Sequence, residues 1–317
     1  MGGKVTCTLG EVKQRADFIV YWGGNPAECH PRHFTKYTIM QKGKFVPNRK
    51  ARTMVLVDIR ETPSEKAADI FLQIRPGKDF ELITALRALV KGQRLDKDRV
   101  AETGVTLEQC EDLVARMKKA RFGVLFFGMG LSMTRGKHMN SAAALTLAAE
   151  LNAFTKFVAM PMRGHGNVTG ADVVLRWTTG YPFGIDLSRG YPRFNPGEFS
   201  TVDLLVRGDN DAALILGADP GATMPQPAID HLTRIPTIVL DPKVTHTSRI
   251  ARVHITTAAT GISAGGTVYR MDEVPLPLRP ALRSPYPTDE EVLRRIRQAV
   301  AARPPWTPAA NGTPRSA

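Results

Sequence analysis

Cysteine is scarce in this sequence, and the long apolar runs typical of membrane proteins are missing. Its three cysteines, Cys7, Cys29 and Cys110, lie far apart and form no C-x-x-C pair. This argues against a disulfide framework, a zinc finger or an iron–sulfur cluster held by this chain alone. No apolar run approaches the roughly 18 residues that cross a bilayer, and the N-terminus lacks the apolar stretch of a signal peptide. We therefore expect a cytoplasmic protein without a membrane partner.

Acidic residues are missing between Glu28 and Asp58, although the 317-residue chain is otherwise of mixed charge, with a net charge of +13. Interleaved proline and glycine predict a loop there, and its basic side chains favour an anionic partner. We find no zinc finger, RNP aromatic pair or recognition helix, so we do not expect nucleic acid. The predicted anion-binding surface comprises Arg32, Lys36, Lys42, Lys44, Arg49, Lys50 and Arg52.

Short β-branched runs alternate with helical patterns along the chain, which predicts an α/β fold with parallel sheets. Strands are expected at 17–22, 53–58, 70–74, 123–127, 213–220, 237–242 and 253–258, and helices near 79–92, 107–120 and 290–300, the first of them capped by Asp79. We divide the chain into a first half, 1–121, and a second half, 122–275, with an irregular insertion at 155–208. A proline-rich segment, 276–317, would hold one helix and a disordered tail.

The most informative feature is an internal repeat. DFIVYWGGNP followed by TMVLVDIRETPSEKAADIFLQI has a counterpart in AALILGADP followed by PTIVLDPKVTHTSRIARVHIT. In both copies the first strand closes with Gly-x-x-Pro and the second ends in an aspartate, Asp58 or Asp241. A basic residue, a threonine and an alanine follow each aspartate at matching distances. Several matches in register indicate two related half-domains.

Parallel sheets place binding groups at the carboxyl ends of their strands. A strand-terminal aspartate can accept a hydrogen bond from a ribose or a purine, and glycine turns let backbone approach a pyrophosphate. Taken singly, each aspartate could simply cap a turn and each glycine could satisfy a positive φ. The paired pattern favours a nucleotide-type fold without requiring that a nucleotide is bound.

Several long segments resemble a known family. VDIRETPSEKAADIFLQIRPGKDFELITALRALVKG resembles the molybdopterin-dinucleotide oxidoreductases. WGGNPAECHPRH, RGHGNVTGADVVLRWTTGYPFGIDLSRGYPRFNPGE and GTVYRMDEVP resemble the B subunit of formylmethanofuran dehydrogenase. The resemblance implies two Rossmann-like parallel-sheet halves related by a pseudo-twofold, without the N-terminal iron–sulfur domain. It also implies a vestigial dinucleotide pocket formed by Gly24, Asn25, Asp58, Arg60, Thr62, Gly128, Gly130, Asp219 and Asp241.

The redox members of the family begin with an iron–sulfur domain and a cysteine or selenocysteine that ligates molybdenum or tungsten. Cys7 lies instead in a segment, TCTLGEV, that resembles a structural part of the family. In this respect the sequence resembles the truncated beta subunit of the bacterial formyltransferase/hydrolase complex of methylotrophs. The alternative is a redox-active formylmethanofuran dehydrogenase subunit that binds a pterin dinucleotide with molybdenum or tungsten.

From the truncated resemblance we expect a non-redox scaffold in the oxidation of formaldehyde to formate, with no catalytic residue, metal or cofactor of its own. Its partners would be a zinc-type amidohydrolase subunit, a formyltransferase subunit and a gamma-type subunit. The basic loop would guide a methanofuran-like polyglutamyl carrier. Arg163 and His165, flanked by glycines, are candidates for a polar channel. Cys29, His30 and His33 lack the spacing of a tetrahedral zinc site.

Overall fold

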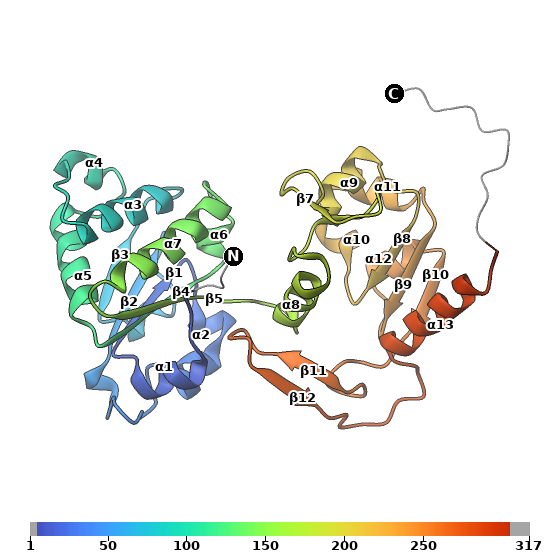
Figure 1. Cartoon of the computed structure of the whole chain (residues 1–317), viewed down its shortest axis with the longest axis horizontal. Coiled ribbons are helices and arrows are strands. Elements are labelled where there is room, and N and C mark those ends of the chain that lie inside the picture. The colour runs from blue at the N-terminus through green and yellow to red at the C-terminus, as the bar shows by residue number, and fades with distance from the viewer. Residues whose placement is uncertain (1–4, 305–317) are drawn as a thin grey trace. The chain divides into compact units, whose positions relative to one another are not determined.

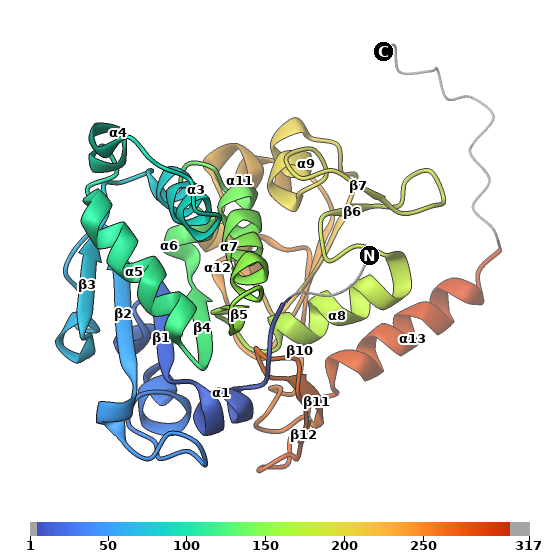
Figure 2. The same cartoon turned by 60° about the vertical axis from the view of Figure 1, so that its left-hand side comes forward.

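The computed structural model describes residues 5–304, which fold as two compact units. Unit 1 runs up to Gly170 and includes Tyr269–Pro275, whereas unit 2 comprises Ala171–Val268 and the chain from Leu276 onward. Figures 1 and 2 show the elements of each unit from two directions. Each unit is described by itself below.

Unit 1 is built on a parallel five-stranded sheet in the order β3-β2-β1-β4-β5. Its strands are β1 (Phe18–Trp22), β2 (Thr53–Asp58), β3 (Ile70–Gln73), β4 (Phe122–Phe127) and β5 (Lys156–Pro161). The chain builds outward from β1 to β3 and then returns to place β4 on the other side of β1. The strand order therefore reverses between β1 and β4, and parallel sheets open a crevice at the carboxyl ends of such strands.

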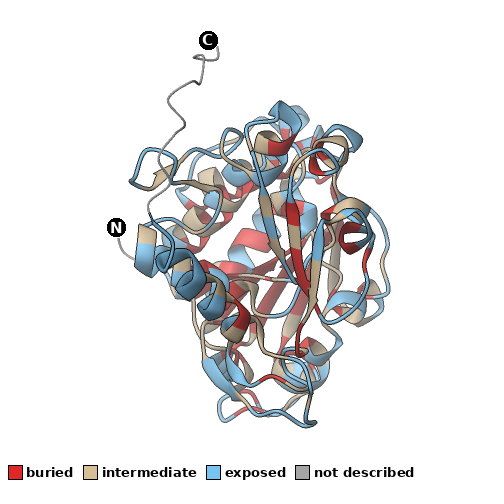
Figure 3. Cartoon of the chain, turned by 90° about the vertical axis from the view of Figure 1, so that its right-hand side faces the viewer, coloured by how far each residue is buried: buried red, intermediate tan, exposed pale blue. Residues whose placement is uncertain are grey.

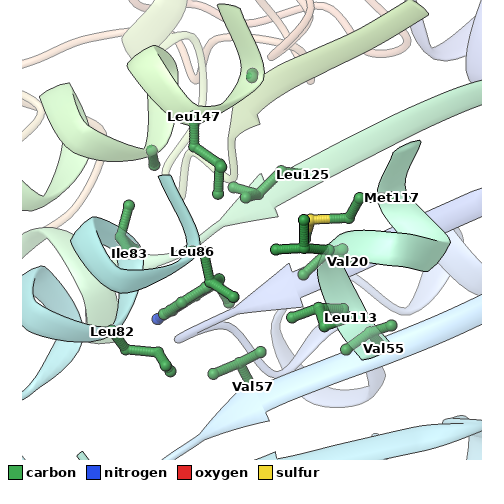
Figure 4. Close-up of a cluster of buried hydrophobic side chains, with 14 of the residues drawn as sticks. Val20, Val55, Val57, Leu82, Ile83, Leu86, Leu113, Met117, Leu125 and Leu147 are labelled. Atoms are coloured by element: carbon green, nitrogen blue, oxygen red, sulfur yellow. The ribbon is translucent and has the colours of Figure 1, made fainter. Parts of the chain in front are cut away.

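Helices cover both faces of this sheet. The helices α3 (Asp79–Val90), α5 (Leu107–Lys119) and α7 (His138–Leu151) pack on one face, where Figure 4 shows side chains of α3 and α5 meeting valines of β1 and β2. The other face packs against α1 (Leu9–Arg15) and a π-helical turn, His33–Tyr37. Both faces are buried, so the strands are continuous apolar runs rather than alternating ones.

Shorter elements connect the parts of unit 1. They are α2 (Pro26–Cys29), the 3₁₀ turns Arg49–Ala51 and Glu65–Ala67, α4 (Lys97–Ala101) and α6 (Met129–Ser132). The turn at α2 directly follows β1, and α6 directly follows β4. Because β1 and β4 are neighbouring strands, these two short helices begin at adjacent carboxyl ends of the sheet, where the strand order reverses.

Unit 2 contains a parallel three-stranded sheet in the order β10-β9-β8. Its strands are β8 (Ala213–Leu216), β9 (Thr237–Asp241) and β10 (Val253–Thr256). Leu205 of α9 (Thr201–Arg207) and Leu232 of α11 (Gln226–Leu232) form a small core with Ala213 and Ile215 of β8. Figure 3 shows how much of this unit is exposed or only half-buried.

The remaining elements lie around these sheets. They are α8 (Val168–Thr179), the antiparallel pair β6 (Ile185–Asp186) and β7 (Arg193–Phe194), α10 (Pro220–Thr223), α12 (His246–Ile250), the pair β11 (Gly266–Tyr269) and β12 (Pro275–Leu278), and α13 (Asp289–Ala301). Thr288 caps α13 in a reciprocal bond with Glu291, which accounts for the start of this predicted helix.

The structure differs from the sequence-based predictions in three places. The expected division at 121/122 falls inside the sheet of unit 1, because β4 pairs with β1 and β5 with β4. The segment 155–208 is not irregular: it contains β5, α8, β6, β7 and α9, whose short runs gain their regularity from tertiary packing. Asp79 is the first residue of α3 rather than its cap, which is Lys78. The predicted disordered tail lies mostly outside the described residues.

Candidate functional site

A cavity of about 300 Å³ opens at the carboxyl ends of the strands of unit 1. It is surrounded by the segments that follow β3, β2, β1 and β4, as the reversal of strand order predicts. Among its walls are six residues of the pocket predicted from the sequence, namely Gly24, Asn25, Asp58, Arg60, Thr62 and Gly130. Residues far apart in the chain therefore meet at one site.

Glycines shape the wall between β1 and β4. Gly23 has φ +56°, and a Cβ there would lie 2.4 Å from the backbone nitrogen of Leu131. A Cβ on Gly128 would lie 2.4 Å from the carbonyl oxygen of Gly23, and Gly130 donates its N–H to that same oxygen at 2.9 Å. The two turns thus pack backbone against backbone, which leaves no room for side chains. Gly128 supports this wall but does not line the cavity.

Ser64 fixes the Gly-Gly-Asn-Pro turn after β1. This residue is fully buried, and its hydroxyl accepts the N–H of Ala27 at 3.0 Å and donates to Oδ1 of Asn25 at 2.5 Å. Asn25 in turn donates through Nδ2 to Glu28 at 2.6 Å. Ser64 was missed in the reading of the sequence. Its position six residues after Asp58, matched by Thr247 six residues after Asp241, was the signal that could have identified it.

Two polar atoms at the cavity have no hydrogen-bond partner. Asp79 is 2% exposed; its Oδ1 accepts the indole N–H of Trp22 at 2.9 Å, but its Oδ2 is buried and unpaired. The hydroxyl of Thr62 is also buried and unpaired. Burial raises the pKa of Asp79, and the hydrogen bond from Trp22 offsets this only in part. Buried polar groups without partners are costly, and they are typical of sites that complete their bonding with a ligand.

Unit 2 repeats the turn geometry of unit 1. Gly217 has φ +55° and donates its N–H to Leu240 at 2.9 Å, as Gly23 does to Val57. Thr247 donates its hydroxyl to Asp219 at 2.6 Å and accepts the N–H of Gly221 at 2.8 Å. These are the contacts that Ser64 makes with Asn25 and Ala27. The internal repeat therefore extends from the sequence to individual hydrogen bonds.

The two aspartates of unit 2 are engaged in these turns. Burial acts to raise the pKa of Asp219, but hydrogen bonds from Thr247 and His246 outweigh it and lower the pKa to about 2. Asp241 is 5% exposed and accepts the backbone N–H of Lys243 at 3.0 Å. Both carboxylates thus hold local turns, which is the structural alternative that the sequence left open.

Two members of the predicted anion-binding surface have other partners. Arg52 is 2% exposed, and its guanidinium donates to the carbonyls of Val12, Lys13, Ala16 and Gln41. Arg49 is half-buried and pairs with Asp69 at 3.0 Å. The prediction of an anionic partner is therefore wrong for Arg52, whose buried guanidinium donates its hydrogen bonds to backbone carbonyls instead. The exposed basic residues that remain are Arg32, Lys36, Lys42, Lys44 and Lys50.

The three histidines His30, His33 and His165 differ in burial and in hydrogen-bond partners. His33 is buried beside the hydroxyl of Tyr21 and the sulfur of Met271, and burial lowers its pKa to about 3. His30 donates Nε2–H to the carbonyl of Arg163 at 2.8 Å, whereas His165 is exposed with φ +46°. Across residues 5–304, no group of three or more His, Cys, Asp and Glu side chains is placed to hold a metal ion.

Comparison with known proteins supplies the family. No protein-family model matches the chain. The chain is 50% identical over 295 residues to the B subunit of the tungsten-containing formylmethanofuran dehydrogenase 2 of Methanocaldococcus jannaschii, covering 92% of this chain and 67% of that protein. The corresponding subunit of Methanococcus maripaludis is 45% identical over 297 residues, covering 93% and 68%. The chain belongs to the family of formylmethanofuran dehydrogenase B subunits.

More distant relatives share this fold. The B subunit of the formyltransferase/hydrolase complex Fhc of Methylorubrum extorquens is 23% identical over 274 residues, covering 84% of this chain and 68% of that protein. The crystal structure of FhcABCD with methylofuran superposes with a TM-score of 0.72 at 21% identity, covering 95% of this chain and 79% of the matched chain. Acetylene hydratase from Pelobacter acetylenicus superposes with a TM-score of 0.62 at 14% identity, covering 92% of this chain and 49% of the matched chain.

These comparisons confirm two expectations drawn from the sequence. The resemblance to the B subunit of formylmethanofuran dehydrogenase is confirmed at high identity, and the α/β fold with parallel sheets is shared with the Fhc chain and with acetylene hydratase. The Fhc protein is a more remote relative than the two dehydrogenase subunits. Within the described part of the chain, every helix is too short or too polar to cross a membrane.

Proposed function

We propose that the chain is the nucleotide-holding part of a formylmethanofuran dehydrogenase B subunit, and that the cavity of unit 1 binds the nucleotide end of a pterin dinucleotide. The observation that carries this proposal is the open cavity lined by Asp79 and Thr62, each of which also has a buried polar atom without a hydrogen-bond partner. A pocket that had lost its ligand would be expected to fill with side chains or to lose its unpaired polar groups, since both are costly to keep.

The residues present fit such a group. Gly24 and Gly77 line the cavity without side chains, so a phosphate can approach the backbone there, and Thr62 lines the same cavity. An ionised Asp79 only accepts hydrogen bonds, so it selects a base that presents N–H donors, as guanine does. When bound, the pterin with its molybdenum or tungsten supplies the two-electron chemistry at the formyl carbon. The protein's own contribution in this unit is to hold and orient the nucleotide.

Nucleotide titration tests the proposal. The chain should bind GDP more tightly than ADP, because guanine places two N–H donors side by side and adenine does not. Binding should release protons at pH values above the ordinary carboxyl value, because donors from the base stabilise the ionised form of Asp79, whose pKa burial raises. Equal affinity for the two nucleotides, or no binding of either at millimolar concentration, would contradict the proposed site.

A second candidate is the non-redox scaffold expected from the sequence. Its support is the similarity to the B subunit of Fhc and the five exposed basic residues on the loop after β1. In that role the chain would hold a zinc-type amidohydrolase, a formyltransferase and a gamma-type subunit together around the carrier. Sequence identity favours the dehydrogenase, because the chain is 50% identical to the dehydrogenase subunit and 23% identical to the Fhc subunit. Metal analysis of the purified complex separates them, since stoichiometric tungsten or molybdenum supports the first and excludes the second.

Guidance of an anionic carrier is compatible with either candidate and is tested separately. Replacing Arg32, Lys36, Lys42, Lys44 and Lys50 by glutamine should abolish salt-sensitive binding of polyglutamate. A matched control replaces three exposed arginines of α13, Arg294, Arg295 and Arg297. If the control weakens binding as much as the loop variant does, attraction is due to net charge and the loop has no specific role.

A further inference from the structure

The repeat between the two units is incomplete at one edge. In unit 1 the strand β1 is central, flanked by β2 and β4, whereas its counterpart β8 is the edge of the sheet β10-β9-β8. Nothing in the described part of unit 2 corresponds to β4 or β5. One edge of β8 therefore has no strand beside it, although the repeat places a strand there.

The backbone groups of β8 face this open edge. Ala213 and Gly217 donate their N–H groups to Pro236 and Leu240, on the side of β9. Successive residues of a strand direct their N–H groups to alternate sides, so those of Leu214 and Leu216 face away from β9. Their counterparts by the repeat are Val20 and Trp22, which face β4 in unit 1, and Trp22 accepts the N–H of Gly128 at 2.9 Å.

On one face of the sheet, two side chains of β8 are less covered than their counterparts in β1, since strand side chains point to the faces of a sheet. Val20 and Trp22 are 0% exposed in unit 1, but Leu214 and Leu216 are 45% and 39% exposed. A cavity of about 470 Å³ runs beside β8, lined by residues of α9, β8 and α10 that include Leu204, Leu205, Thr223 and Met224. A strand with an apolar face is the element that such a groove and such an edge accommodate.

The turn after β8 also lacks the neighbouring turn that packs against its counterpart in unit 1. A Cβ on Gly23 would collide with backbone of Gly130 and Leu131, from the turn after β4. Gly217 has the same backbone conformation, yet no described atom lies within 4 Å of the position of its Cβ. The space that the second turn occupies in unit 1 is thus empty in unit 2.

From these observations we propose that the free edge of β8 binds a parallel strand that ends in a small-residue turn against Gly217, as β4 does with β1. The occupant is a polypeptide segment outside the residues that the structure describes. About a third of the Methanocaldococcus jannaschii subunit lies outside the match, which covers 67% of that protein. We assign the strand to that part of the family's proteins. The inference rests on the repeat and is independent of the cofactor proposed above.

Co-expression tests the proposal. The part of the Methanocaldococcus jannaschii subunit outside the match is produced as a separate polypeptide together with this chain, and hydrogen exchange of the chain is measured with and without it. We expect a stable complex in which the amides of Leu214 and Leu216 exchange at least tenfold more slowly. The amides of Val253 and Ile255, on the opposite free edge of the same sheet, should be unchanged.

A matched pair of variants separates edge pairing from general packing. Leu214→Pro removes one N–H at the proposed edge, and Val253→Pro removes one at the opposite edge; proline is tolerated at edge positions whose N–H faces outward. Leu214→Pro should weaken capture of the segment at least tenfold, and Val253→Pro should leave it unchanged. The proposal is overturned if the two variants behave alike, if the segment does not bind, if binding leaves the β8 amides unprotected, or if these amides are already protected in the chain alone.

Discussion

Replacing Asp79 by asparagine should make the ligand-free chain more stable and its nucleotide site weaker. The substitution keeps an Oδ1 that can accept the indole N–H of Trp22, which Asp79 accepts at 2.9 Å. It removes the buried, unpaired Oδ2 and with it the negative charge. Stability and binding should therefore move in opposite directions, a result that a purely structural role for the residue does not produce.

The pH dependence of stability follows from the raised pKa. The ordinary value for the carboxyl is 3.8, and burial raises it in the folded chain. Folding therefore takes up protons between the two pKa values, so the contribution of Asp79 is fully present below the ordinary value and declines as pH rises through the folded value. The asparagine variant lacks this decline. The two proteins should converge in stability near pH 4 and separate toward neutrality.

The magnitudes are set by burial and by charge. An unsatisfied buried polar group costs about 1 to 3 kcal/mol, and the amide of asparagine retains part of that cost. We expect Asp79→Asn to raise the free energy of unfolding by about 1 kcal/mol at pH 7. A hydrogen bond to a charged group contributes about 1.5 to 3 kcal/mol, so GDP affinity should fall roughly 10-fold to 150-fold.

Urea denaturation followed by circular dichroism between pH 4 and 8 measures the first effect, and calorimetric titration with GDP measures the second. Thr62→Val provides a companion variant, because it removes the other unpaired polar atom of the cavity without a change of charge. It should weaken GDP binding without altering the pH dependence of stability. A loss of stability at pH 7 in Asp79→Asn, or unchanged GDP affinity, would refute the reasoning.

Three further predictions concern the framework of the site. Gly128→Ala should lower the free energy of unfolding by at least about 2 kcal/mol, because its Cβ would lie 2.4 Å from a carbonyl oxygen. Gly164 has open space around it, so Gly164→Ala should change the denaturation midpoint little. Ser64→Ala and Thr247→Val each remove a buried hydroxyl that bonds two partners, so each should lower the free energy of unfolding by about 1 to 3 kcal/mol. A near-neutral result for both variants would show that these bonds do not hold the turns. His33 has a pKa lowered from 6.5 to about 3, so folding excludes its proton and stability should fall as pH drops from about 6.5 toward 3; His33→Gln should flatten that part of the profile, measured by thermal unfolding.

The sequence by itself determined the class of fold and the location of the site. Apolar strand runs that end in Gly-x-x-Pro or aspartate indicate parallel strands with binding groups at their carboxyl ends, because a short local pattern suffices to define each strand and its turn. The repeat could be read from the same pattern. All seven expected strands were found, and six of the predicted pocket residues meet around one cavity.

Only the tertiary structure decided which polar residues line the cavity and which hold the fold. The sequence pattern places Arg52 among the basic residues of an exposed loop. In the structure its guanidinium is buried among the carbonyls of Val12, Lys13, Ala16 and Gln41. Ser64 and Thr247 are marked in the sequence only by their matching positions in the repeat, because their partners lie 25 to 40 residues away. Burial and the pairing of β4 with β1 depend on how distant segments pack, and a local pattern does not encode that packing.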